Sequence, residues 1–208
     1  MSFPPDTMQL VLATNNEDKI REIKNLLDDL PVTILTRDDF LEFPDVEETG
    51  STLEENAVLK AKAISEYCDL PALADDSGLE VDALDGAPGV YSSRYAGDGC
   101  TYRDNNEKLL HAMQDIPRDD RTARFHCVIA IAWDAESVQT VEGTAEGFIA
   151  KDIAGREGFG YDPVFYYPPE KKRFSEMTLE EKNQVSHRGL ALQNARTLII
   201  ERLNMLRD

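Results

Sequence analysis

The strongest constraint on the fold is an apolar run in the middle of the chain, from Arg124 to Trp133. Its length and its aliphatic side chains predict a buried strand. Residues 138–146 alternate apolar and polar side chains, which predicts the hairpin partner of that strand. The chain is therefore expected to fold around a β-sheet.

The N-terminal part of the chain adds helices to this sheet. An apolar run at 9–13 ends in the polar turn 14–16, and apolar side chains at helical spacing follow at Ile20, Ile23, Leu26 and Leu27. Residues 32–35 are short and apolar enough for a second strand. The order strand, turn, helix is typical of α/β domains.

A second helix is predicted after an acidic loop at 45–50. Either Ser51 with Glu54 or Thr52 with Glu55 can form its capping box, and Pro71 stops it. Its buried stripe consists of Leu53, Ala57, Ala61, Ile64 and Cys68. The following run 72–74 is too short for a strand of its own, although residues 79–81 can continue it.

Two further helices complete the prediction. One spans 102–113, and one runs from about Ser186 to the end, with apolar side chains at Leu192, Ala195, Ile199, Leu203 and Leu206. The glycine-rich segment 155–163 reads as a loop. We expect an α/β fold in which one domain, residues 9–208, carries a mixed sheet with flanking helices and follows an N-terminal extension, residues 1–8.

The charge of the chain limits its partners. The formal net charge is −18, which disfavours nucleic acid polymers and anionic membranes. A small anion can still bind in a local pocket of lysines, backbone N–H groups and a metal ion. Three cysteines without CxxC spacing, and no apolar stretch of membrane-spanning length, predict a soluble protein of the reducing cytoplasm.

The turn at residues 14–19 is the first candidate site. It leads from a strand into a helix N-terminus, where free N–H groups and the helix dipole attract phosphate. Thr14 and Asn16 can add hydrogen bonds, and Lys19 a full charge. The glycine framework of a P-loop is absent, and an ordinary helix cap is the alternative interpretation.

The second candidate is the pair Asp75-Asp76, followed by Ser77-Gly78. Adjacent carboxylates at the end of a buried run are costly unless something neutralises them, and a hard divalent metal ion bound through oxygen does that. Because successive strand residues point to opposite faces, only one carboxylate need face a site. The acidic loop 47–50 can supply a second metal ligand, and Lys60 a phosphate contact. An Asp-rich turn and a solvated loop are the alternatives.

Two further candidates lie near the C-terminus. The aromatic and glycine residues of 158–163 offer a stacking surface for a nucleobase, or a bulged turn. His187 and Arg188 lie in the first turn of the last helix, where cations oppose the helix dipole and so indicate an anionic ligand. His111 and His126 have no partner spacing and are interpreted as structural.

Taken in order, these segments resemble the inosine/xanthosine triphosphate pyrophosphatase family, which removes deaminated purine nucleotides. The resemblance rests on six blocks, namely LATNNEDKIREI, EETGSTLEENAVLKAKA, ADDSGLEVDALDGAPGVYSSRYAG, ARFHCVIA, GFGYDPVF and EKNQVSHRGLAL. It implies an elongated α/β fold with two lobes around a central cleft, a homodimer, and a Mg²⁺ cofactor. Asp18 stands where many members have glycine, which adds negative charge to the turn.

The resemblance also implies a role for individual residues. Asp76 is the catalytic base and a metal ligand, and Glu47 is the second metal ligand, with Glu48 as the alternative. The residues implied in substrate binding are Thr14, Asn15, Asn16, Glu17, Asp18, Lys19, Lys60, Ser77, Phe159, Gly160, Tyr161, Asp162, Lys182, His187 and Arg188.

The implied reaction is hydrolysis of ITP, dITP and XTP to the nucleoside monophosphate and pyrophosphate. A pyrophosphatase for modified pyrimidine nucleotides, as in related septum-inhibitor-like proteins, is one alternative. A nucleotide sensor without turnover is the other.

Overall fold

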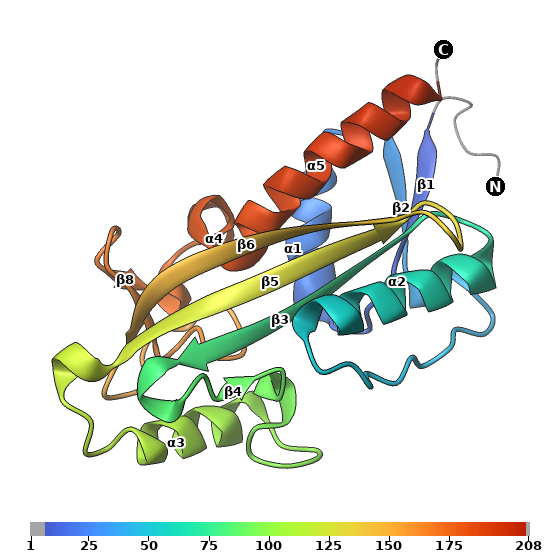
Figure 1. Ribbon diagram of the computed structural model, residues 1–208. Coiled ribbons are helices and arrows are strands. Elements are labelled where there is room, and N and C mark those ends of the chain that lie inside the picture. The colour runs from blue at the N-terminus through green and yellow to red at the C-terminus, as the bar shows by residue number, and fades with distance from the viewer. Residues whose placement is uncertain (1–6, 207–208) are drawn as a thin grey trace. The chain divides into compact units, whose positions relative to one another are not determined.

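The computed structural model describes residues 7–206, which form eight strands and five α-helices (Figure 1). The strands are β1 Met8–Leu12, β2 Val32–Leu35, β3 Ala72–Val81, β4 Pro88–Gly89, β5 Thr122–Ala132, β6 Val138–Ile149, β7 Phe165–Tyr167 and β8 Lys172–Arg173. The helices are α1 Glu17–Leu27, α2 Leu53–Cys68, α3 Tyr102–Ala112, α4 Leu179–Val185 and α5 His187–Met205. None of these helices is long and apolar enough to cross a membrane.

The strands form one mixed sheet of eight strands in the order β2-β1-β3-β5-β6-β7-β8, with β4 paired to β3. β1 pairs in parallel with β2 and with β3. The pairs of β3 with β4, β6 with β7 and β7 with β8 are antiparallel. The mixed α/β fold expected from the sequence is therefore confirmed, including β5 and β6 as neighbouring strands.

The chain divides into two compact units that do not follow the sequence order. The first comprises Met1–Asp76, Val128–Glu142 and Ala191–Asp208, and the second comprises Ser77–Cys127 and Gly143–Leu190. The expected domain boundary at residue 9 lies inside β1, which begins at Met8. Residues 1–6 of the expected extension, and residues 207–208, lie outside the described part of the chain.

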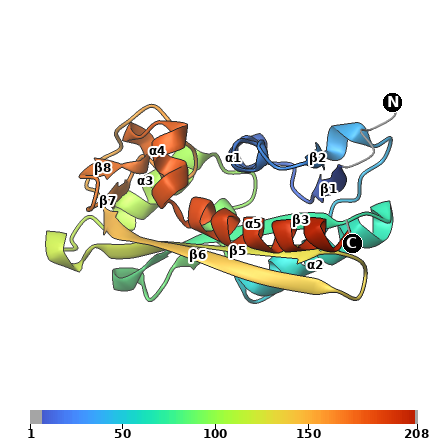
Figure 2. The same ribbon diagram turned by 90° about the horizontal axis from the view of Figure 1, so that it is seen from above.

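In the first unit, helices cover both faces of the sheet. α1 and the residues of α5 that belong to this unit lie on one face, and α2 lies on the other (Figure 2). Ile23 of α1 and Ala61 of α2 are completely buried, as expected from their helical spacing. Arg196 of α5 ties this helix to α1, because its guanidinium donates to the Leu26 carbonyl and pairs with Asp29 at 2.6 Å.

The second unit has its own apolar core, in which aromatic rings dominate. The rings of Phe125 and Phe165 lie 4.7 Å apart, and those of Phe165 and Phe174 lie 4.9 Å apart. Leu79 of β3 and Leu109 of α3 pack into the same cluster. This core holds β3, β5, β6, β7 and α3 together within the unit.

Several expected boundaries need correction. Residues 72–74 do not stand alone, because β3 runs without a break through Asp75, Asp76 and the following glycine. Leu206 was expected on the buried stripe of the last helix but is 63% exposed, since α5 ends at Met205. The short helix α4 was not expected at all. Of the two possible capping boxes of α2, the structure forms Thr52 with Glu55.

Candidate functional site

Strand β3 directs its two adjacent aspartates to different helices of the first unit. Successive side chains of a strand point to opposite faces of the sheet, and the two faces here carry α1 and α2. Asp75 accordingly pairs with Lys19 of α1 at 3.1 Å, and Asp76 pairs with Lys60 of α2 at 3.0 Å. The Asp75 carboxylate is fully buried, which its ion pair makes possible inside a strand. Each of the two carboxylates within the continuous strand β3 is therefore neutralised by a lysine from a different helix.

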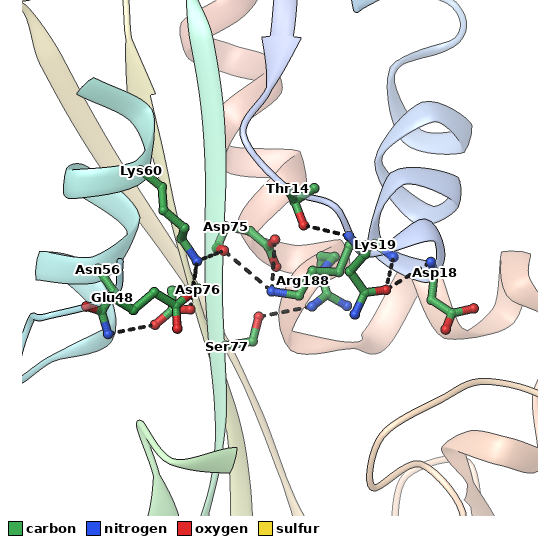
Figure 3. Close-up of polar contacts among 11 residues, drawn as sticks. Thr14, Asp18, Lys19, Glu48, Asn56, Lys60, Asp75, Asp76, Ser77 and Arg188 are labelled. Atoms are coloured by element: carbon green, nitrogen blue, oxygen red, sulfur yellow. Dashed lines mark hydrogen bonds and ion pairs between the residues drawn. The ribbon is translucent and has the colours of Figure 1, made fainter. Parts of the chain in front are cut away.

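Lys60 is the centre of a cluster of carboxylates (Figure 3). Its ammonium Nζ lies 2.7 Å from Glu48 Oε1, 3.0 Å from Asp76 Oδ1 and 3.0 Å from the carbonyl oxygen of Asp75. Its side chain is 11% exposed and that of Asp76 is 10% exposed. Loop 45–50 and helix α2 therefore both reach the same point of β3.

The Asp75 carbonyl can bind the lysines because β1, the neighbouring strand, pairs with β3 only as far as Leu73, two residues before Asp75. The last contacts between the strands are the register pair Leu12 with Leu73 and the bond from Ala13 N–H to the Leu73 carbonyl. Beyond this point the chain turns away at Thr14. Lys60 Nζ donates to the Asp75 carbonyl at 3.0 Å and Lys19 Nζ approaches it at 3.5 Å. Both lysines of the cluster are thus held where the parallel ladder stops.

The protonation of the cluster is set by burial and by charge. Burial raises the pKa of Asp76 above its ordinary value, although Lys60 and Lys19 pull it down. Burial disfavours the charged form of Lys60, but attraction to Asp76, Glu48 and Asp75 outweighs this and raises its pKa. The arrangement therefore has a lysine that stays charged and a carboxylate that accepts a proton more readily than a free aspartate.

The turn at 14–19 is stabilised by its own side chains. Asn16 caps α1 by accepting hydrogen bonds from the N–H groups of Asp18 and Lys19, and Thr14 Oγ1 accepts from Asn16 N–H. The charge of Asp18 is paired with Arg21 at 2.9 Å. The side chains of Asn15 and Glu17 are exposed. Lys19 is the residue of the turn that contacts the carboxylate cluster.

The structure places the two glutamates of the acidic loop differently. Glu48 is half-buried and pairs with Lys60, whereas the side chain of Glu47 is exposed. Among residues 7–206 no group of three or more histidine, cysteine, aspartate or glutamate side chains is arranged to hold a metal ion. Mg²⁺ needs only one or two protein carboxylates, because waters and substrate phosphates fill the other positions. Asp76 and Glu48 are the two carboxylates that converge on Lys60 in this cluster.

Asn56 of α2 was not expected in the site. Its amide nitrogen donates to Asp76 Oδ2 at 3.4 Å, and its amide oxygen accepts from Gly50 N–H at 2.8 Å. Because Asn56 and Lys60 are four residues apart, they share one face of α2. Lys60 contacts Oδ1 of Asp76 and Asn56 contacts Oδ2. The same two side chains bind Glu48 and Gly50, the two ends of the segment 48–50. In the sequence, Asn56 is a polar residue at the helical spacing of the buried face of α2, and this spacing could have identified it as part of a site.

Gly50 gives a first prediction, since a Cβ atom at this position would lie 2.6 Å from Asn56 Oδ1 and 2.7 Å from Glu55 Cβ. We expect Gly50→Ala to push the loop away from α2 and lower the free energy of unfolding by about 1–3 kcal/mol. Urea denaturation measures the change, with Thr49→Ala, an exposed neighbour, as the control. Equal stability of the two variants would contradict the close packing of the loop.

The second unit holds another buried ion pair beside an aromatic ring. Lys182 Nζ lies 2.6 Å from Asp162 Oδ2, and both side chains are less than 5% exposed. The same oxygen of Asp162 accepts from Phe159 N–H at 2.8 Å. The Phe159 ring lies 4.8 Å from Lys182 Nζ and 5.4 Å from the guanidinium carbon of Arg188, measured to the ring centroid. These contacts bring four of the expected substrate-binding residues together.

The start of α5 contributes the remaining expected residues. Ser186 caps the helix, since its hydroxyl accepts from Gly189 N–H at 3.1 Å. His187 stacks on Phe125 with ring centroids 4.4 Å apart and planes 8° from parallel. Arg188 donates to the Ser77 hydroxyl at 3.0 Å (Figure 3). The expected position of His187 and Arg188 in the first turn of the helix is confirmed.

The loop that carries Phe159 is supported from segment 92–106. Tyr161 is buried, which raises the pKa of its phenol well above the ordinary value, and its hydroxyl donates to the Ser92 carbonyl at 2.9 Å. Asn106 donates to the Gly160 carbonyl at 2.8 Å. Neither Ser92 nor Asn106 was singled out in the sequence, because both lie far along the chain from the loop that they support.

Comparison with known proteins places this arrangement among its relatives. The Ham1 family matches the chain over residues 10–198. A dITP/XTP pyrophosphatase from Desulforamulus reducens is 50% identical over 92% of this chain and 96% of its own length. One from Geobacter sulfurreducens is also 50% identical, over 88% of this chain and 92% of its own length.

Solved structures agree with the sequence comparison. A HAM1 protein from Coxiella burnetii superposes with a TM-score of 0.86 at 44% identity, covering 94% of this chain and all of that one. The Ham1 protein of Staphylococcus aureus superposes with a TM-score of 0.83 at 40% identity, covering 93% of this chain and 99% of its own.

Proposed function

Because this chain belongs to the Ham1 family, we propose that it hydrolyses the triphosphates of deaminated purine nucleosides, namely ITP, dITP and XTP, to the monophosphate and pyrophosphate. The observation that carries the proposal is the buried cluster of Lys60, Asp76 and Glu48, with Lys19 bound to the adjacent Asp75. It combines two cations suited to a polyphosphate with a carboxylate suited to proton transfer.

We propose Asp76 and Glu48, rather than Glu47, as the ligands of a magnesium ion. The support is that Glu48 reaches the same lysine as Asp76, whereas the Glu47 side chain is exposed. Magnesium bound there would offset the negative charge of the phosphate chain during hydrolysis. In the structure Lys60 bridges the two carboxylates. With magnesium bound to them, Lys60 would be available to contact phosphate oxygens.

Asp76 is the proposed general base. It accepts a proton from the water that attacks the α-phosphorus, the bond between that phosphorus and the bridging oxygen breaks, and pyrophosphate leaves. Its pKa, raised by burial, makes it a stronger proton acceptor than a free aspartate. Lys19 and Lys60 stabilise the charge that develops on the leaving pyrophosphate.

The turn 14–19 is proposed to bind the phosphate chain mainly through Lys19 and the hydroxyl of Thr14. The N–H groups of Asp18 and Lys19 already donate to Asn16, so a phosphate must compete with this cap or bind beside it. Arg21 offsets the charge of Asp18, the position where many family members have glycine. The contacts of Asn15, Asn16 and Glu17 stay a prediction.

The loop of Phe159 is proposed to bind the base. The Phe159 ring offers a stacking surface, and Lys182 and Arg188 beside it are hydrogen-bond donors. A 6-oxo purine accepts such bonds, whereas the 6-amino group of adenine leaves the donors unpaired. Ser77 and His187 complete the proposed contacts, and Asp162 holds Lys182 in place.

We further propose a cytoplasmic homodimer. The location follows from the substrate, since nucleotide pools lie in the cytoplasm, and the three cysteines are all free thiols. Light scattering of the purified protein across a range of concentrations would test the dimer. A single species of monomer mass would remove that part of the proposal.

A nucleotide panel tests the function. We expect pyrophosphate release from dITP, ITP and XTP to exceed release from ATP by at least about 100-fold in kcat/KM, because a site built for an acceptor rejects a donor. Release should stop when EDTA removes divalent cations and return with Mg²⁺. Equal rates on all purine triphosphates would leave a hydrolase without this selectivity. Preference for modified pyrimidines, or binding without turnover, would establish one of the two alternatives.

A further inference from the structure

We propose that Asn106 of α3 is a positioning residue for nucleobase recognition, because it fixes the peptide group between Gly160 and Tyr161 in the loop that carries Phe159. This inference rests on the proposed function and extends it to a residue outside the expected site. All of the residues involved belong to the second unit. Asn106 itself is 2% exposed and is not expected to touch the nucleotide.

The amide of Asn106 is bound on one side only. Its nitrogen donates to the Gly160 carbonyl and to the Tyr102 carbonyl, each at 2.8 Å. Its oxygen is buried and has no hydrogen-bond partner among the described residues. Burying an unsatisfied amide oxygen costs stability, and an aliphatic side chain of similar size avoids this cost. The one contact that the Asn106 amide makes outside its own helix is the bond to the Gly160 carbonyl, so the side chain acts on the position of this loop.

Holding the carbonyl of Gly160 also sets the direction of the next N–H group. The peptide between Gly160 and Tyr161 is planar and trans, so its N–H points opposite to its carbonyl. Within residues 7–206, no group accepts a hydrogen bond from the Tyr161 N–H or from the Gly160 N–H. Asn106 thus directs the Tyr161 N–H, a donor of the loop, away from α3, and we infer that the nucleobase accepts from it.

Gly160 permits this geometry. Its φ is +60°, in the left-handed region that favours glycine, and there is open space where a Cβ atom would lie. The loop is anchored on the other side by Tyr161, whose hydroxyl donates to Ser92. The ring of Tyr102 lies 5.9 Å from that of Phe159, so α3 contacts the loop at a second point. Helix α3 therefore supports both the stacking ring and the peptide next to it.

The test compares Asn106→Leu and Asn106→Asp with the parent protein. Leucine removes the donor, and aspartate keeps the shape but presents a carboxylate to two carbonyl groups. We expect both variants to raise the KM for dITP and the Kd for inosine monophosphate about tenfold, the usual effect of losing one well-placed hydrogen bond. The kcat should stay within threefold, and inhibition by inorganic tripolyphosphate, which has no base, should not change. The preference for dITP over dATP should fall in both variants.

Asn194→Leu is the matched control, because it removes one bond from an asparagine amide to a backbone carbonyl, that of Glu142, in the first unit. It should leave KM, Kd and base preference unchanged. Unchanged values in both Asn106 variants, or a parallel loss of tripolyphosphate inhibition, would overturn the inference. Failure of the parent to release pyrophosphate from dITP would instead reject the proposed function, and the Kd measurements would still judge the role of Asn106.

Discussion

Replacing Asp76 with asparagine is expected to lower kcat for dITP on the order of 10³-fold, the usual contribution of a general base. The amide cannot accept the proton of the attacking water, and it also removes a charge from the proposed metal site. Lys60 and Glu48 keep their contact at 2.7 Å, so the loop 45–50 should stay in place. Pyrophosphate release at saturating dITP and Mg²⁺ measures the effect.

The stability of the same variant gives an independent check. Burial raises the pKa of Asp76 in the folded protein, so the charged carboxylate is less favourable there than in the unfolded chain. A neutral asparagine relieves this cost, but its amide NH2 must face Lys60 or Asn56, both of which donate to Asp76, so the two effects oppose each other and the urea midpoint should change little. Asp38→Asn, an exposed position in the same unit, is the control and should change neither property. Near-normal turnover of Asp76→Asn would reject the assigned base.

The ion pair of Asp162 and Lys182 is expected to give the largest stability effect. Asp162→Asn leaves the Lys182 ammonium in a site where its side chain is 4% exposed, without the carboxylate that neutralises it. Removing one partner of a buried ion pair typically costs about 3–5 kcal/mol. We expect the free energy of unfolding to fall by this amount in urea denaturation at neutral pH.

A double variant separates the charge from the packing. Asp162→Asn combined with Lys182→Met removes both charges, so its loss of stability should be smaller than that of either single variant. Asparagine can still accept from the Phe159 N–H, which preserves the loop. Additive losses would show that the two side chains do not depend on each other. If the double variant regains stability but has little activity, the pair of Asp162 and Lys182 contributes to substrate binding as well as to stability.

Local signals in the sequence were sufficient for most of the fold. The apolar spacing of residues 20–27 and 53–68 predicted α1 and α2, and the helix expected over 102–113 is α3. The caps at Asn16 and Thr52 mark the starts of α1 and α2. Strand β3 was predicted only as the fragments 72–74 and 79–81, because Asp75 and Asp76 interrupt its apolar pattern. The two ion pairs that compensate them come from helices distant in sequence, and no local pattern reports such compensation.

The candidate site was predictable where its residues follow one another in a motif. Residues 75–77, 159–162 and 182–188 are candidates on the sequence alone. Asn56, Ser92 and Asn106 are not, because their role arises from tertiary contacts. The choice between Glu47 and Glu48 also depends on which side of the loop faces α2. Spacing along an irregular loop does not reveal this.

The order in which the chain enters the two units has a consequence for how the protein is made. Residues from Ala191 onwards belong to the same unit as the first strand, and Arg196 anchors them to α1. A ribosome therefore cannot finish the unit that holds Lys19, Lys60 and Asp76 until nearly the whole chain has emerged. Nonsense codons or affinity tags that disturb helix α5 should consequently disable chemistry that depends on residues 19–76.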